Sequence, residues 1–440
     1  MARATDRSER ARRGREGRGR GAHERKRVAE RRAAPVASAR TRASEAEGPH
    51  VPCPHFPACV GCPLVGTPYP AQLAAKDATL RDALARQHLH VTRVEPAVGS
   101  PRAFGYRNHA KLVFRSRRAP HGAREVVLGV YRPGTHSVAP ADGCIVHHRL
   151  LQPVLRVLRR EVERLEIPIF DERVRTGALR YALARASSAQ GAVHLTLVSA
   201  ISDPPQLREL IARLRRELPT LAAGFLCVNP TPGNVLLTSD IRRLFGPPAL
   251  LERFGDVELE SRPDAFLQAN AAVASRIYAT VRSWLAPRPD DVALDLYCGV
   301  GGIALHLAPA LRRVLGIEGQ PSAVDCATSS ARRRRVANAE FVAAPVEDTL
   351  RIAGERGLTS PTLVAVNPPR KGLTAQVVEV VAQLAPRKIA YVSCDPTSLA
   401  RDLALLTARG YGVERVRAFD MLPQTPHVEA VALLERRDAP

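Results

Sequence analysis

A strand followed by a glycine-rich turn, in the segment DVALDLYCGVGGIALHLAP, constrains the fold of this chain more than any other feature. The apolar run 292–296 predicts a buried strand, and Gly299, Gly301 and Gly302 predict a turn at which a ligand can approach the backbone. About 20 residues later, RRVLGIEG predicts a second strand that ends in Glu318, an acid placed to bind ribose hydroxyls. The pattern predicts a Rossmann-like α/β domain, and it fits NAD and S-adenosylmethionine equally well.

Two later strands also end in polar residues. LVAVNPPRKGL predicts a strand that ends at Asn367, and KIAYVSCDP predicts one that ends at Cys394. A last strand, in HVEAVALLER, carries His427 and Glu429. Ligands bind at the carboxyl edge of an open α/β sheet, so we expect a site at this edge. Successive strand ends present Asp295, Glu318, Asn367 and Cys394.

Cys394 taken alone allows three interpretations: a packed core residue, a metal ligand or a nucleophile. Its neighbour Asp395 either orients adjacent groups or caps a helix that begins near Thr397. We expect Asp402 to be a solvated acid on that helix. Two further cysteines, Cys298 and Cys326, lack a partner motif and are interpreted as structural.

A second group of cysteines lies near the N-terminus. CPHFPACVGCPL holds Cys53, Cys59 and Cys62 as C-x5-C-x2-C, and three soft thiolates call for a fourth ligand. Cys227 follows apolar residues and is expected in the core, so Cys144 is the better fourth ligand. The spacing leaves an iron–sulfur cluster and a zinc site open, the latter with Cys144 or a histidine of 147–148, as well as unligated thiols.

The charge balance indicates a polyanionic partner. The net charge is +22, of which the first 48 residues carry +8, so the remainder of the chain is basic as well. Within FGYRNHAKLVFRSRR, two aromatic residues could stack on bases and five basic ones could follow a phosphate backbone, although a solvated strand with core aromatics is equally compatible. These residues are Phe104, Tyr106, Arg107, Lys111, Arg115, Arg117 and Arg118.

Length and composition set the remaining expectations. A chain of 440 residues is too long for one ordinary core, so two domains are expected. Residues 1–49 contain few large apolar side chains and are expected to be a disordered tail. The chain shows no secretory signal and no apolar run long enough for a membrane span, so we expect a cytoplasmic protein without membrane contact. Helical patterns fall at 68–90, 151–165 and 205–217, and the segment 68–100 is expected to pack on the C-terminal domain.

Taken together, the motifs give a specific resemblance. The chain resembles the S-adenosylmethionine-dependent RNA uracil-C5 methyltransferase family, which modifies tRNA and 23S rRNA. The matching pieces run in family order from residue 53 to the C-terminus: CPHFPACVGC, RNHAKLVF, RPDAFLQAN, DLYCGVGG, GIE, NPPRKG, SCDPTSLARDL and HVEAVALL. The resemblance implies Cys394 as nucleophile and Glu429 as base. It also implies S-adenosylmethionine contacts from Gln268, Tyr297, Glu318 and Asn367, and a 4Fe–4S cluster on Cys53, Cys59, Cys62 and Cys144.

The implied chemistry explains why these residue types are needed. Uracil C5 is a weak nucleophile, and addition of a thiolate to C6 converts the ring into an enolate that is reactive at C5. Cysteine is a soft nucleophile and a good leaving group, and a shielded carboxylate can remove the C5 proton. Arg370 could bind phosphate or the enolate oxygen.

The expected organisation is therefore α/β. It comprises the tail 1–49, a central α+β iron–sulfur and RNA-binding module at 50–262, and a Rossmann-like methyltransferase domain at 263–440. The cysteine motif follows the tail without the OB-like domain of longer members, which favours a monomeric 23S rRNA enzyme, whereas the cysteine spacing also suits the longer members. We hypothesise that the tail is a non-specific RNA anchor. The rivals are an amino-group methyltransferase, because Asn-Pro-Pro also occurs there, and a non-catalytic RNA-binding factor.

Overall fold

The computed structural model describes residues 53–118, 122–231 and 235–437, all within one compact unit formed by residues 48–440. The predicted tail, residues 1–49, lies outside the described residues. None of the described helices is both long and apolar enough to cross a bilayer.

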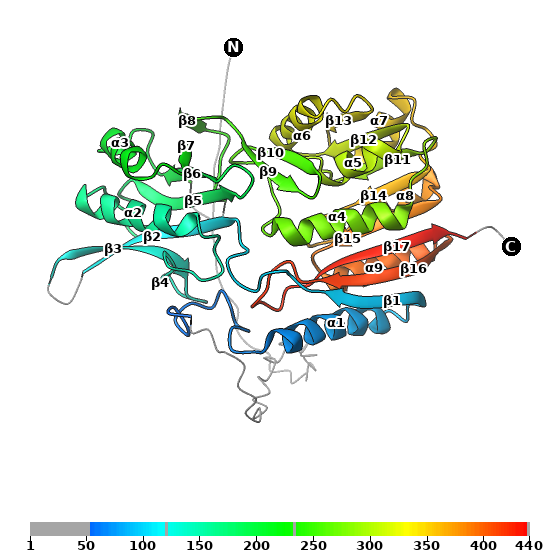
Figure 1. Cartoon of the computed structure of the whole chain (residues 1–440), viewed down its shortest axis with the longest axis horizontal. Helices are drawn as coiled ribbons and strands as arrows, with labels where there is room; N and C mark the ends of the chain where they lie inside the picture. The colour runs from blue at the N-terminus through cyan, green and yellow to red at the C-terminus, as the bar shows by residue number, and fades with distance from the viewer. Residues whose placement is uncertain (1–52, 119–121, 232–234, 438–440) are drawn as a thin grey trace, which may run out of the picture. The chain divides into compact units, whose positions relative to one another are not determined.

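An eight-stranded sheet forms the C-terminal half of the protein, with the strand order β1-β16-β17-β15-β14-β11-β12-β13 (Figure 1). The strands from β15 to β13 are parallel, whereas β17 is antiparallel to both β15 and β16. The bounds are β1 (Val91–Val98), β11 (Val292–Leu296), β12 (Arg313–Glu318), β13 (Ala339–Ala343), β14 (Leu363–Val366), β15 (Lys388–Ser393), β16 (Tyr411–Phe419) and β17 (Glu429–Arg436).

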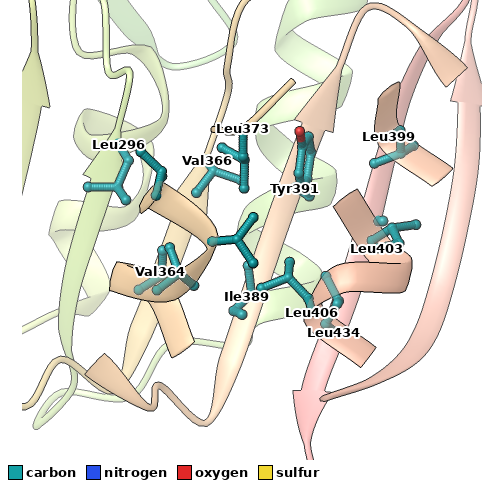
Figure 2. Close-up of a cluster of buried hydrophobic side chains, with 14 of the residues drawn as sticks. Leu296, Val364, Val366, Leu373, Ile389, Tyr391, Leu399, Leu403, Leu406 and Leu434 are labelled. Atoms are coloured by element: carbon teal, nitrogen blue, oxygen red, sulfur yellow. The ribbon is translucent and has the colours of Figure 1, made fainter. Parts of the chain in front are cut away.

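Helices cover both faces of this sheet because its strands are apolar on both sides. Val292 and Leu294 of β11 point into one apolar cluster, and Ala293 between them points into the other. Figure 2 shows the first cluster, where Ile389 of β15 lies next to Leu406 of α9. The first cluster contains α1 (Tyr69–Arg86), α7 (Thr349–Glu355), α8 (Ala375–Leu384) and α9 (Pro396–Thr407); the second contains α4 (Ala271–Leu285), α5 (Gly302–Leu307) and α6 (Pro321–Arg333). Short 3-10 turns lie at Ala308–Ala310 and Val346–Asp348.

The first strand of the described chain is an edge strand of this sheet, and the first helix packs against the sheet. β1 pairs in parallel with β16, Val91 opposite Val413, and Leu80 of α1 is buried in the same apolar cluster as Leu403. The prediction that residues 68–100 pack on the C-terminal half is therefore confirmed. The described strands of residues 53–262, which the sequence predicts as one module, are divided among this sheet, a seven-stranded sheet and a two-stranded hairpin.

The remaining strands form a seven-stranded sheet in the order β4-β3-β2-β5-β6-β7-β8. Its helices lie on one face, and the opposite face holds a smaller apolar cluster. The strands are β2 (His109–Arg118), β3 (Arg124–Tyr131), β4 (Val138–Pro140), β5 (Leu179–Ser187), β6 (Ala192–Ser199), β7 (Leu221–Val228) and β8 (Ile241–Phe245), and the helices are α2 (Leu151–Arg164) and α3 (Leu207–Glu217). A separate hairpin joins β9 (Leu250–Phe254) to β10 (Val257–Ser261).

Candidate active site

A cavity of about 510 Å³, here called the strand-end cavity, opens at the carboxyl ends of β11, β12, β14 and β15. Of the four strand-end residues that the sequence predicts to meet at this edge, Glu318, Asn367 and Cys394 line the cavity, whereas Asp295 does not. The lining includes Gln268, Tyr297, Glu318, Asn367, Arg370, Cys394 and Glu429.

The glycine turn after β11 is held by the acid at the end of β12. Glu318 accepts hydrogen bonds from the backbone N–H groups of Gly299, at 3.0 Å, and of Gln320, at 2.9 Å. Gly299 has a φ of +54°, in the left-handed region, and Tyr297 has a φ of 60° although it is not a glycine. Residues held in this region often border binding sites, because neighbouring contacts must offset the strain.

Behind the turn, a buried carboxylate fixes the start of α5. Asp295 is fully buried and accepts a hydrogen bond of 2.8 Å from the N–H of Ala304. Burial, with a smaller contribution from Glu318, raises the pKa of Asp295 to about 7. Gly302 permits close packing here, since a Cβ would lie 2.7 Å from the Tyr278 ring. Asp295 therefore supports the turn from inside the domain.

The segment that carries Gln268 is held by the other sheet. Asn108, next to β2, donates from its side chain to the carbonyl of Gln268 at 2.9 Å, and its N–H donates to the carbonyl of Ala269 at 2.9 Å. The strand-end cavity is thus bounded by residues of both sheets.

Cys394 and Glu429 face one another because their strands are antiparallel neighbours. Ser393 of β15 pairs with Ala430 of β17, so the next position along puts Cys394 opposite Glu429. Burial and then the nearby Glu429 carboxylate raise the pKa of Cys394, while Arg370 lowers it. Burial raises the pKa of Glu429 to about 7, and Arg370 again opposes the shift. One guanidinium therefore favours the charged form of both groups.

Cys394 lies in a tight turn at the start of α9. Asp395 accepts a hydrogen bond of 2.8 Å from the N–H of Ser398, and Pro396 occupies the first helical position. Of the two roles considered for Asp395, the structure therefore shows the helix cap.

The prediction for Asp402 is wrong. This acid is completely buried and accepts hydrogen bonds from the Tyr391 hydroxyl, at 2.6 Å, and from the N–H of Leu373, at 2.7 Å. It ties the loop after Arg370 to α9. The signal was available in the spacing, because Asp402 follows Leu399 by three residues and so lies on the apolar face of the helix.

The loop between β16 and β17, residues 420–428, is held from α1. Lys76 is buried, forms an ion pair with Asp420 and donates to the carbonyl of Leu422 at 3.1 Å. Gln72 and Gln424 exchange two hydrogen bonds of 2.9 Å. These contacts fix the segment that leads to Glu429.

Tyr106 also holds this loop, because its hydroxyl donates to the carbonyl of Pro423 at 2.9 Å. It is 7% exposed, so it cannot stack on an RNA base, and the core interpretation of this aromatic is correct. Of the five basic residues in the same segment, Arg117 is paired with Glu125.

The N-terminal cysteines line a separate cavity of about 80 Å³, here called the cysteine cavity. Burial, followed by the other three thiols, raises the pKa of Cys62 to about 12. Cys227 lies apart in the core and accepts from the N–H of Thr238, as expected for a packed residue. In the part of the chain that the structure describes, no group of three or more His, Cys, Asp or Glu side chains is arranged to hold a single metal ion. The four cysteines around the cavity are Cys53, Cys59, Cys62 and Cys144.

Comparison with known proteins shows the family to which the chain belongs. The family model described as tRNA (Uracil-5-)-methyltransferase matches residues 255–437. An uncharacterised RNA methyltransferase of Geobacter sulfurreducens is 36% identical over 386 residues, covering 88% of this chain and 77% of the relative. The chain belongs to the RNA uracil-5 methyltransferase family.

Other members extend the match over most of the chain. An uncharacterised RNA methyltransferase of Caldanaerobacter subterraneus is 32% identical over 388 residues, which cover 84% of its length. The crystal structure of Pyrococcus abyssi tRNA (uracil-54, C5)-methyltransferase in complex with S-adenosyl-L-homocysteine aligns with a TM-score of 0.69 and 27% identity, over 86% of each chain. The chain is thus an RNA (uracil-5-)-methyltransferase with a mixed α/β fold.

Proposed function

We propose that this methyltransferase modifies uracil C5 in RNA through a covalent adduct between Cys394 and C6 of the base. One observation carries the proposal: the register of β15 and β17 puts a thiol opposite a buried carboxylate, beside the glycine turn and in the same cavity. A uracil ring between the two groups would present C6 to the thiolate and C5 to the base.

The cofactor proposed for the strand-end cavity is S-adenosylmethionine, which supplies the methyl group when bound. Tyr297, Glu318, Asn367 and Gln268 are the residues proposed to hold it. The complex of the Pyrococcus abyssi enzyme with S-adenosyl-L-homocysteine supports this assignment. So does the turn itself, whose glycine backbone and Glu318 carboxylate suit a nucleoside with free ribose hydroxyls.

The protein groups act in three steps. The Cys394 thiolate adds to C6, and the electrons of the C5–C6 double bond move towards the C4 carbonyl, giving an enolate with electron density at C5. After the methyl group has been transferred to C5, the Glu429 carboxylate removes the C5 proton. The electrons of that C–H bond re-form the double bond, and the C6–sulfur bond breaks to release the thiolate.

The charges in the cavity suit this sequence. Arg370 favours both the Cys394 thiolate and the Glu429 carboxylate, the forms that the nucleophile and the base require. In amino-group methyltransferases the residue after Asn-Pro-Pro is usually an aromatic that stacks on the base. Here it is Arg370, and those enzymes need no cysteine, so this rival is disfavoured.

We also propose a 4Fe–4S cluster on Cys53, Cys59, Cys62 and Cys144. The four thiols share one cavity, and their mutual repulsion as thiolates calls for a cation.

The proposed role of the cluster is structural. The N–H of Leu64, two residues after Cys62, donates to the carbonyl of Gln424 at 3.1 Å. The cysteine segment is therefore connected to the loop before Glu429, and the reaction needs no electron transfer.

Two RNA substrates are proposed for testing. The resemblance of the motifs supports 23S rRNA, and the tRNA named for the Pyrococcus abyssi enzyme supports tRNA. Transfer of a labelled methyl group to each RNA in competition, followed by mapping of 5-methyluridine, separates them.

A deletion of the tail, residues 1–48, should weaken RNA binding and flatten its salt dependence. Unchanged binding would remove the tail from the proposal.

A covalent trap tests the chemistry. The full chain is incubated with S-adenosylmethionine and a 5-fluorouridine-substituted RNA, and the products are run on a denaturing gel. Fluorine at C5 cannot leave as a proton, so a shifted protein–RNA band is expected, and Cys394→Ala should lack it. No band, together with methyl transfer to unsubstituted RNA, would favour the amino-group reaction instead. Cofactor binding without either result on 23S rRNA or tRNA would favour a non-catalytic factor.

A further inference from the structure

A second cavity, of about 160 Å³ and here called the sheet-face cavity, adjoins the strand-end cavity. Both are lined by His109, Phe266 and Leu267, so the two spaces share a wall. The sheet-face cavity lies over the face of the seven-stranded sheet opposite α2 and α3, where strand residues are accessible to a ligand.

Strand register puts basic and polar side chains on this face in two rows. His109 of β2 is paired with Arg185 of β5, which is paired with His194 of β6. Two residues further along each strand, Lys111 and Thr196 flank Leu183 on the same face. The main wall of the sheet-face cavity is formed by these residues.

His194 provides the observation that points to a ligand. It is 5% exposed, it lines the cavity, and its Nε2 has no hydrogen-bond partner. The ring packs on Phe225, with centroids 5.8 Å apart. Burial, with a contribution from Arg185, lowers the pKa of His194 to about 4, so the ring is neutral. A buried polar atom is almost always hydrogen-bonded in a folded protein, so this nitrogen calls for a partner.

The charges in the cavity favour an anion. Lys111 is in no ion pair among the described residues, and the nearby Arg185 and Arg107 add to the positive charge around it. The acid in the lining is Asp264. Arg185 is occupied with the strap at 261–265, since it donates to the carbonyls of Arg262 at 2.9 Å and Ala265 at 3.0 Å. Its positive charge still acts on the cavity.

We propose that the sheet-face cavity binds a backbone phosphate of the RNA, within a few nucleotides of the target uridine. The Lys111 ammonium, the Thr196 hydroxyl and His194, in the tautomer protonated at Nε2, are the donors. A phosphate oxygen accepts from all three, whereas a nucleobase edge mixes donors and acceptors. The inference rests on the proposed function, because it takes the strand-end cavity as the site of the target base.

A phosphate scan tests this. RNA fragments with one neutral methylphosphonate at each linkage near the target are bound to the full chain, to Lys111→Met and to His194→Ala. One linkage should weaken binding to the wild-type chain about 10-fold. A methylphosphonate at the same linkage should weaken RNA binding by either variant less than about 2-fold, since the variant has already lost the contact. The variants should retain the wild-type turnover at saturating RNA and the wild-type affinity for S-adenosylmethionine. The matched control is Arg208→Met, on α3 at the opposite face, which should show the wild-type pattern.

Three results would overturn the inference. An equal methylphosphonate cost in wild type and Lys111→Met would show that the cavity holds no phosphate. Coupling of the variants to an abasic site instead would show that it holds a base. No sensitive linkage at all would leave the cavity without an RNA contact. Lys111 is exposed, so Lys111→Met should fold and give a binding result even if His194→Ala does not fold. Because binding is measured, a failed covalent trap with intact coupling would overturn the proposed chemistry and not this site.

Discussion

The thiols of Cys62 and Cys394 both have a pKa raised mainly by burial, and they differ in the charged groups that add to this effect. In the cysteine cavity, Cys62 is crowded by three other thiols, and no carboxylate is among the causes of its shift. In the strand-end cavity, Cys394 is a single thiol between a carboxylate that raises its pKa and an arginine that lowers it. The residue type and the direction of the shift are the same, and the neighbours differ.

The difference indicates how each thiol is used. Several thiolates in one small space repel one another, and a bound cation relieves the repulsion permanently, as a ligand set requires. One thiol beside a guanidinium can lose its proton, add to a base and leave again. Under the proposal, ligand and nucleophile therefore differ in the number of thiols around them and in the carboxylate beside Cys394, whereas an arginine lowers the pKa in both places.

The largest expected effect separates the two groups directly. Cys394→Ala should lower methyl transfer by at least about 1,000-fold, because the adduct cannot form, yet leave bound iron unchanged. Transfer of a tritiated methyl group and iron content are the two measurements. The control is Cys326→Ala, a buried thiol of α6, which should keep both. Near-normal transfer by Cys394→Ala would remove the nucleophile from the mechanism.

Glu429→Gln should lower turnover about 100- to 10,000-fold, because an amide cannot take the C5 proton. The adduct should still form, so a covalent band should accumulate with unmodified RNA. The pKa of Glu429 is about 7 and the base must be ionised, so wild-type turnover should fall as pH drops below 7. A pH-independent turnover between 5 and 8 would contradict a role for this carboxylate.

Cys62→Ser should behave in the opposite way to Cys394→Ala. Bound iron and sulfide should fall to background, and the melting temperature should drop, because metal binding is coupled to folding. The methyl-transfer loss should be smaller than for Cys394→Ala and appear mainly as weaker RNA binding. Full iron in the Cys62→Ser protein would show that these thiols do not share a cluster.

Arg370→Met should shift the pH dependence. Arg370 lowers the pKa of both Cys394 and Glu429, so its loss should raise both and move the rising limb of turnover to higher pH. Single-turnover rates across pH are the measurement, and Arg370→Lys should restore part of the shift. An unchanged limb in the methionine variant would show that this charge does not act on either group.

The smallest expected effect concerns the turn that presents Cys394. Asp395→Ala removes the cap of α9 and should cost about 1 kcal/mol of unfolding free energy. Asp395→Asn, which can still cap, should recover most of it. Thermal or urea unfolding measures both, and equal stability of all three proteins would argue against the cap.

The edge where the site residues meet can be predicted from the sequence, because the carboxyl ends of parallel strands all lie at the same edge of a sheet. Each strand is an apolar run, and Glu318, Asn367 and Cys394 stand at or just after the ends of three of them. The helices at 151–165 and 205–217 were predicted within a few residues for a similar reason, since a 3.6-residue apolar period is local.

Other features depended on contacts far apart in the chain. Lys76 was missed as a buried partner of Asp420, 344 residues away, although its spacing from Leu80 put it on the apolar face of α1. The sequence allows Tyr106 to contact an RNA base, but in the structure its hydroxyl donates a hydrogen bond to the carbonyl of Pro423. A polar group can be buried at little cost only when it has a hydrogen-bond or ion-pair partner, and the sequence does not show which distant residue will be that partner.

By itself the sequence determined the family, the strand-end residues and the four cysteines of the N-terminal group, because these follow from local patterns and their order. Three further features are visible only in the folded protein: Cys394 lies opposite Glu429, α1 holds the loop before Glu429, and the basic side chains of the sheet-face cavity adjoin the strand-end cavity. The physical reason is register: which residues face one another across antiparallel strands depends on how the whole sheet pairs, and on the burial that makes one pairing favourable.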